Sequence, residues 1–178
     1  MSRTIAIVAA LAALAVPAVA LAANGTSGPD VFAGTPEADK YHGRGGDDEI
    51  NGAAGNDKLF GNKGDDTVAG DEGNDRVSGG FGDDDLDGGT ENDRVFPGKG
   101  EDSVDAGDGD DRVYARDHQA DEIDCGAGED RVKADASDTL TNCENAKVRK
   151  GHGPSAKEDR SGRPTEKRGK ARGPKPKS

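Results

Sequence analysis

A nine-residue pattern recurs through the middle of this chain, from Gly25 to Lys133, and it restricts the possible folds more than any other feature. Each unit has the form G-G-x-G-x-D-x-U-x, where U is a large apolar residue. The stretch from Gly79 to Asp87, Gly-Gly-Phe-Gly-Asp-Asp-Asp-Leu-Asp, is a clear copy. Such a unit joins a glycine turn to a three-residue strand, so it must stack on other copies to bury its one apolar side chain.

Composition alone would indicate a disordered chain. Only 30% of the 178 residues are hydrophobic, 28 are Gly, and the net charge is −12. A chain of this kind buries too little apolar surface to offset its conformational entropy. Disorder, however, does not require an aspartate and an aliphatic residue at fixed spacing. The periodicity therefore indicates a folded structure that uses the aspartates.

The register of the units is unusually regular. Ten successive units carry Asp at the sixth position and an apolar residue at the eighth, from Asp30 and Phe32 to Asp111 and Val113. The unit that begins at Ala115 has one extra residue, and the register returns at Cys125. From Ala134 the pattern decays, as expected where a final repeat covers an open strand edge.

Alternate units should stack on one another, because each three-residue strand recurs eighteen residues later, two units along the chain. Stacked parallel strands lie about 4.8 Å apart. Each coil then contains two turns and two strands, and the eighth-position side chains fill the space between two small sheets. We therefore predict an all-β fold, a parallel β-roll or β-solenoid of glycine- and aspartate-rich nonapeptide repeats.

Stacked turns of this type predict metal sites between neighbours. Glycine at the first, second and fourth positions permits left-handed backbone angles, which turn the chain sharply and direct carbonyl groups into the turn. Calcium takes six to eight oxygen ligands, so one turn with its Asp supplies about half of them and the next turn in the column supplies the rest. Five regular turns in each of two columns predict about eight calcium ions.

Charge supports the same expectation. Residues 23–146 contain 33 acidic and 11 basic residues, a net charge of −22. A compact body with that charge would repel itself unless it bound cations.

The turns resemble the RTX, or haemolysin-type, calcium-binding repeats, most clearly in the units that begin at Gly43 and Gly79. The resemblance covers residues 25–133 and implies a secreted bacterial repeat protein with a parallel β-roll and calcium between its turns. It implies that the sixth-position aspartates bind the metal, each bridging two ions, together with main-chain oxygens: Asp30, Asp39, Asp48, Asp57, Asp66, Asp75, Asp84, Asp93, Asp102, Asp111, Asp121 and Asp130. Weaker binding is expected at turns that depart from the pattern, which contain Glu37, Glu91, Pro97 or Ala106 or span 115–121.

Residues 1–22 have the features of a secretory signal peptide. Arg3 precedes an apolar run, and Ala20-Leu21-Ala22 forms a small-x-small cleavage site, with cleavage expected after Ala22 or, as the second choice, after Ala20. A membrane anchor is the alternative, disfavoured because the run is short and Pro17 interrupts it. We expect an exported protein, secreted or associated with the cell surface, with no membrane span after cleavage.

The C-terminal residues, 147–178, form a third region after the signal peptide (1–22) and the β-roll (23–146). They contain 12 basic and 3 acidic residues without apolar periodicity, so we expect a disordered tail. Such a tail is either solvated or contacts anionic cell-envelope polymers. No aromatic residue is present to stack on bases, so no specific nucleic-acid partner is expected.

Cys125 and Cys143 are eighteen residues apart, one coil of the predicted roll. In an exported protein an even pair favours a disulfide, and one coil places the two residues within reach of each other. This bridge would hold the decayed last coil to the last regular one.

The predicted function is that of a secreted calcium-binding protein, without enzymatic activity, whose folding is coupled to binding several ions. The alternative is an extracellular adhesive or glycan-binding module in which calcium is only structural. An active site would need residues outside the repeat, and the irregular turn with Arg116, Asp117 and His118 is the candidate for one. Acidic pairs that recur in nearly every turn favour metal binding instead, because an active site is normally singular.

Overall fold

The computed structural model describes residues 22–149. The predictions for the signal peptide and for the tail beyond Arg149 therefore concern residues outside the described part of the chain. Within residues 22–149 the regular elements are all strands, and no helix there could span a membrane.

The strands form two parallel sheets. The eight-stranded sheet contains the odd-numbered strands β1 (Ala22–Asn24), β3 (Lys40–His42), β5 (Lys58–Lys63), β7 (Arg76–Phe81), β9 (Arg94–Lys99), β11 (Arg112–Ala115), β13 (Arg131–Asp135) and β15 (Lys147–Arg149). The seven-stranded sheet contains the even-numbered strands β2 (Val31–Ala33), β4 (Glu49–Asn51), β6 (Thr67–Ala69), β8 (Asp85–Asp87), β10 (Ser103–Asp105), β12 (Glu122–Asp124) and β14 (Thr139–Thr141).

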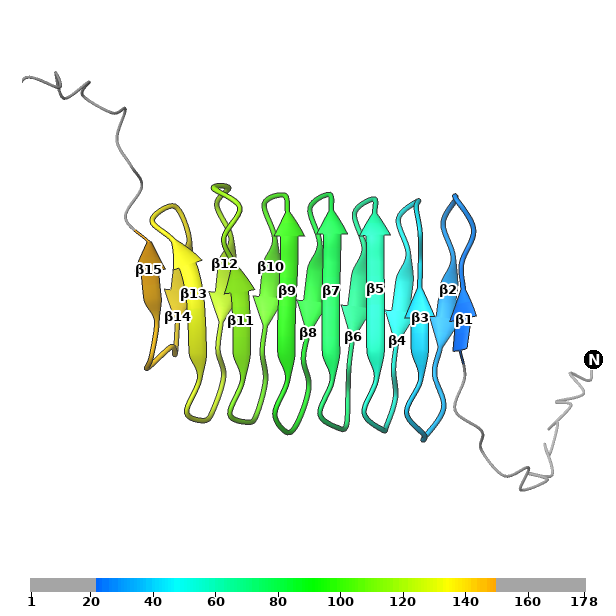
Figure 1. Cartoon of the computed structure of the whole chain (residues 1–178), viewed down its shortest axis with the longest axis horizontal. Helices are drawn as coiled ribbons and strands as arrows, with labels where there is room; N and C mark the ends of the chain where they lie inside the picture. The colour runs from blue at the N-terminus through cyan, green and yellow to red at the C-terminus, as the bar shows by residue number, and fades with distance from the viewer. Residues whose placement is uncertain (1–21, 150–178) are drawn as a thin grey trace, which may run out of the picture.

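The chain alternates between the two sheets and advances by one coil for every two units (Figure 1). Leu59 pairs with Val77 and Val77 with Val95, a register of eighteen residues. Across the longer unit Val104 pairs with Ile123, so the extra residue is absorbed in the turn and the strands stay aligned. The predicted parallel β-roll is confirmed.

The core is a continuous stack of eighth-position side chains between the two sheets. Ten of them, from Phe32 to Val113, are between 0% and 6% exposed, and Ile123 and Val132 continue the stack after the insertion. Phe32 and Tyr41 stack at the N-terminal end with their ring centroids 4.1 Å apart. Because each strand from β2 to β14 contributes one large inward side chain, joined in β11 and β13 by a small alanine, one coil cannot form a core alone and depends on its neighbours.

The glycine at the first position of the units does not have the predicted left-handed backbone angle. Left-handed φ angles occur at the second and fourth positions, as at Gly80 (135°) and Gly82 (124°), but not at the first position of the units. A Cβ at the first-position Gly61 would instead collide with the carboxylate of Asp66, its own sixth-position residue. At Gly61 the glycine therefore permits a close approach of the carboxylate and is not needed for backbone freedom.

Several non-glycine residues adopt the left-handed conformation where the pattern departs from glycine. Arg44, Ala53, Asn62 and Asp71 do so at the second position, and Glu91 at the fourth. These turns thus keep the geometry of the glycine units, whereas Thr35 and Glu37 at the second and fourth positions of their unit do not adopt the left-handed conformation.

The two ends of the roll refine the predicted boundaries. β1 begins at Ala22, directly at the expected cleavage site. β15 extends the roll three residues beyond 146, because Lys147–Arg149 pairs with β13, although two of its three residues are charged and Val148 is exposed. Ladder hydrogen bonds to an existing edge do not require an inward apolar residue. Cys125 and Cys143 form the predicted disulfide, with Cα atoms 5.2 Å apart.

Candidate metal centre

The sixth-position aspartates form two internal columns, one at each long edge of the roll. Asp30, Asp48, Asp66, Asp84, Asp102 and Asp121 follow one another in the column that leads into the even-numbered strands. Asp39, Asp57, Asp75, Asp93, Asp111 and Asp130 follow one another in the column that leads into the odd-numbered strands. The structure thus brings all twelve predicted residues into two regular rows, and all except Asp30 are at most 3% exposed.

One carboxylate oxygen of each inner aspartate has a clear structural partner. The backbone N–H of Asp66 donates to Asp84 Oδ1 at 2.9 Å, and the N–H of Asp75 donates to Asp93 Oδ1 at 2.7 Å. The same bond recurs along both columns, including across the longer unit, where Asp102 N–H donates to Asp121 Oδ1 at 3.1 Å. These bonds join each turn to the next one in its column.

The second carboxylate oxygen is buried without a hydrogen-bond partner. This holds for Oδ2 of nine described aspartates: Asp48, Asp57, Asp66, Asp75, Asp84, Asp93, Asp102, Asp111 and Asp130. An ionised oxygen without a partner in such a position is costly, because burial removes its water and nothing replaces it. In folded proteins, buried polar atoms without a hydrogen-bond partner are few and scattered. Their regular repetition here therefore requires a common explanation.

The surroundings of these oxygens are rich in other oxygens. Beside Gly88, the space that a Cβ would fill lies 2.9 Å from Asp93 Oδ2 and is also bordered by the carbonyl oxygen of Ala106 in the next turn. Gly79 has the same arrangement with Asp84 Oδ2 and the Pro97 carbonyl. Two acceptors that converge on one small space repel each other unless a cation lies between them.

Burial raises the pKa of these carboxyl groups, and neighbouring carboxylates add to the effect. The pKa is raised to about 6 for Asp66 and Asp75, to about 7 for Asp84 and to about 8 for Asp93. The backbone N–H bond to each Oδ1 acts in the opposite direction and is the smaller influence. Desolvation by burial is the largest cause of the raised pKa in each of these four groups.

Protein groups close three of the four column ends. Thr26 N–H and Oγ1 donate to Asp30 Oδ2 at 2.5 and 3.0 Å, and Thr35 donates in the same way to Asp39 at 2.6 and 3.1 Å. At the other end Asp138 Oδ2 accepts the N–H of Asp135 at 2.6 Å. Asp30, Asp39 and Asp138 therefore have hydrogen-bond donors where the inner carboxylates have none, whereas Asp130, the last aspartate of its column, has a buried Oδ2 without a partner.

A second ladder, at the fifth position, was not predicted from the sequence. Asp65 N–H donates to Asp47 Oδ1 at 3.0 Å and Asp83 N–H donates to Asp65 Oδ1 at 2.9 Å, with Asn56 and Asn92 serving the other column. These side chains are exposed and hold the outer rim of the turns. The recurrence of Asp or Asn at this position was the available signal.

The irregular turn uses its polar residues for structural contacts. His118 has a left-handed φ of 79°, its N–H donates to Asp135 Oδ2 at 3.0 Å, and its Nδ1 lies 3.4 Å from the same oxygen. Asp117 accepts the N–H of Gln119 at 2.8 Å and that of Gly100 at 3.4 Å. These bonds replace the glycine turn of a regular unit.

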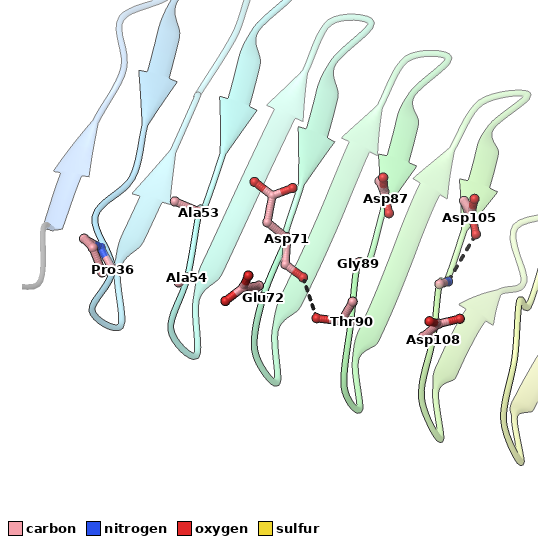
Figure 2. Close-up of a pocket in the computed structure, with 11 residues that line it drawn as sticks. Pro36, Ala53, Ala54, Asp71, Glu72, Asp87, Gly89, Thr90, Asp105 and Asp108 are labelled. Atoms are coloured by element: carbon pink, nitrogen blue, oxygen red, sulfur yellow. Dashed lines mark hydrogen bonds between the residues drawn. The ribbon is translucent and has the colours of Figure 1, made fainter.

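A groove along the ends of the even-numbered strands contains a different set of carboxylates. Figure 2 shows Asp71, Glu72, Asp87, Asp105 and Asp108 around it. These residues come from three successive coils of the roll. Burial and the nearby Asp105 raise the pKa of Asp87. Asp71 and Asp105 of this set accept hydrogen bonds from the Asn51 side-chain amide and the Gly107 N–H, and the set adds negative charge to this surface of the roll.

The donor set of the two columns fits calcium. Calcium takes six to eight oxygens and accepts backbone carbonyls as readily as carboxylates. In residues 22–149 no three acidic, histidine or cysteine side chains cluster closely enough to hold a metal by themselves, so a calcium shell there would also need main-chain oxygens. A parallel β-roll whose turns enclose buried, unpartnered carboxylate oxygens defines the chain as a metal-binding repeat protein.

Comparison with known protein families agrees with this class. The model of the RTX calcium-binding nonapeptide repeat matches in four copies, over residues 24–59, 33–68, 60–95 and 87–117. These matches together cover more than half of the chain. The protein belongs to the RTX calcium-binding repeat family and is a calcium-binding repeat protein. Searches of curated proteins and of solved structures gave no match.

Proposed function

We propose that this chain is an exported, non-enzymatic β-roll whose folding is coupled to binding about eight calcium ions between its turns. Buried Oδ2 atoms without a partner, repeated along both columns, are the observation that supports this proposal most strongly. In the absence of metal, nine such oxygens destabilise the folded state, whereas the same oxygens are hydrated in the unfolded state.

The chain's own residues prepare each shell. The Oδ1 bond fixes the orientation of each carboxylate, and the first-position glycine leaves room beside its Oδ2. Bound calcium supplies the positive charge that these oxygens lack. Because the shell draws on two successive turns, it does not exist in the unfolded chain, so binding energy becomes folding energy.

Export agrees with this mechanism. The N-terminal segment has the pattern of a cleavable signal, and the disulfide suits an oxidising compartment. Calcium is abundant outside cells, so a chain that is unfolded during export would fold on arrival.

Far-UV circular dichroism of the mature chain, with calcium and with a chelator, tests the proposal. We expect a β spectrum in calcium and a largely unfolded spectrum in chelator, with magnesium as the control ion. A chain equally structured in both conditions would refute the coupling.

A further inference from the structure

The basic residues of the roll are confined to one face. All thirteen Lys and Arg between residues 22 and 149 lie in strands of the eight-stranded sheet or within two residues after them. The strands of the other sheet carry no Lys or Arg and expose Glu49, Asp85 and Glu122 at the equivalent position. The roll is therefore a slab with one cationic and one anionic face, although its net charge is strongly negative.

Six of these cations form a straight row, which we call the cationic row. They occupy the seventh position of alternate units and pair in register from strand to strand: Lys40, Lys58, Arg76, Arg94, Arg112 and Arg131. Adjacent strands are about 4.8 Å apart, so the row is about 24 Å long. Its side chains are exposed or half-buried, and the outward positions of these strands carry no exposed Asp or Glu.

None of the six cations is neutralised within the described chain. No Lys or Arg within residues 22–149 forms a salt bridge, and the one contact of salt-bridge length between a basic and an acidic side chain there joins His118 and Asp135. Regular placement of unpaired like charges is unfavourable for the folded roll, because neighbouring cations repel each other. An external anion with a similarly regular charge would offset that repulsion.

A second row, of ring side chains, runs beside the first. His42 stacks on Phe60 with centroids 4.4 Å apart, and Phe96 stacks on Tyr114 at 4.8 Å. The Arg76 guanidinium lies between the two pairs, 4.0 Å from the Phe96 centroid and 5.8 Å from that of Phe60. The ring faces are thus covered by neighbours, and ring edges are what this row presents.

The ring row is interrupted at Ser78, where the face has a shallow hollow. Phe60 and Asn62 of β5 line it, together with Ser78 and the exposed Phe81 of β7. Arg44 and Lys63 also border the hollow. It therefore combines two cations, small polar groups and apolar ring surface within one site on the cationic face.

We propose that this face binds a linear acidic polysaccharide, with its carboxylates along the cationic row and one sugar ring in the hollow beside Ser78. The charge of the face selects a polyanion, and the row is long enough to contact several successive rings. Hydroxyl groups of a sugar find partners in Ser78 and Asn62, and its C–H surface packs on Phe81. This inference goes beyond calcium binding. In the proposed function, calcium folds the roll that carries this face, but the residues of the face do not bind the ions.

Two other occupants agree less well with the geometry. Single-stranded nucleic acid binds by stacking bases on open ring faces, and the faces of the ring row are already covered. A second copy could place its anionic face on the cationic one, but that contact would also bring together two bodies of strong negative charge.

The test measures binding of a short oligogalacturonate, too short to gel with calcium, to the mature chain in saturating calcium by calorimetry. The variant Lys58→Gln/Arg94→Gln/Arg112→Gln removes three of the six charges of the row and leaves the Arg76 stack intact. Its matched control is Glu49→Gln/Asp85→Asn/Glu122→Gln, at the same register position on the opposite face. Both keep the basic tail, and circular dichroism in calcium confirms folding separately.

We expect the row variant to bind about tenfold more weakly and the control variant to bind like wild type, with affinity falling as salt increases. The methyl-esterified oligomer, which has the same rings without charge, should not bind. Unchanged affinity of the row variant would overturn the proposal, as would equal binding of polyphosphate or an oligonucleotide. Concentration-dependent self-association that both variants abolish would assign the face to a second copy and overturn it as well.

Discussion

Replacing Asp93 by Asn should have opposite effects on the calcium-free and the calcium-loaded roll. Asp93 is fully buried, its Oδ1 accepts the Asp75 N–H at 2.7 Å, and its Oδ2 has no partner. Asparagine keeps the Oδ1 acceptor and places a neutral amide donor where Oδ2 stands, near the carbonyl oxygen of Ala106. The substitution thus removes the defect of the metal-free state and the ligand of the metal-bound state.

The size of the effect follows from the pKa of this group, which burial raises to about 8 from a usual value of 3.8. A raised pKa means that the metal-free roll is most stable below pH 4 and loses stability as pH rises toward 8. At pH 7 the ionised Asp93 therefore destabilises the metal-free roll by at most about 4 kcal/mol, because each pKa unit corresponds to about 1.36 kcal/mol. Local relaxation and water entry reduce this destabilisation, so we expect about 2 kcal/mol of stabilisation in the metal-free variant.

The assay is folding of the chelated chain by trimethylamine oxide, followed by circular dichroism, because this osmolyte favours the buried state without supplying charge. Asp93→Asn should fold at a lower osmolyte concentration than wild type. Calcium titration should show the reverse, a higher midpoint and a loss of one or two ions, since the carboxylate faces two intervals of its column.

The control is Asp85→Asn, which removes a carboxylate of the same chain from the exposed surface of β8. It should alter neither midpoint appreciably. If chelated Asp93→Asn required as much osmolyte as Asp85→Asn, the claim that unpartnered carboxylates destabilise the metal-free roll would be refuted.

Four further predictions concern other parts of the roll. In chelator, acidification from pH 8 to pH 5 should increase β content, because the raised pKa values of the inner aspartates let them enter the roll neutral; a flat profile by circular dichroism would contradict this. Gly61→Ala should destabilise the calcium-loaded roll by about 1–3 kcal/mol in urea unfolding through its collision with a carboxylate, whereas Gly45→Ala, with no neighbour closer than 3.7 Å, should be tolerated. Leu86→Ala should cost about 2–5 kcal/mol in the same assay, since Leu86 is 0% exposed, and a loss below 1 kcal/mol would exclude a packed interior. Reducing the bridge between Cys125 and Cys143 should cost about 3 kcal/mol, and an unchanged melting temperature after reduction would count against its stabilising role.

The core and the carboxylate columns could be predicted from the sequence because each depends on one position of the repeat. Leu86 at the eighth position and Asp84 at the sixth point inward wherever the unit stacks, whatever the rest of the unit contains. The insertion before Asp121 was also readable, because the register resumes after it.

Other features depend on relations between units and were harder to see. The cationic row appears only when alternate units are compared, because the seventh position alternates between basic residues such as Arg94 and acidic or neutral ones such as Asp85. The function of the first glycine depends on how closely Asp66 approaches Gly61, which no local pattern encodes. β15 has two charged residues among its three and was assigned to the tail, since edge pairing needs backbone groups and not apolar side chains.

Isothermal titration of the chelated mature chain with calcium, with circular dichroism recorded at each addition, tests the central claim most directly. If ions between the turns complete the oxygen shells and fold the chain, about eight ions should bind, with a large coupled heat and a parallel rise in β content. Saturation at one or two ions, or binding without a change in β content, would contradict the account.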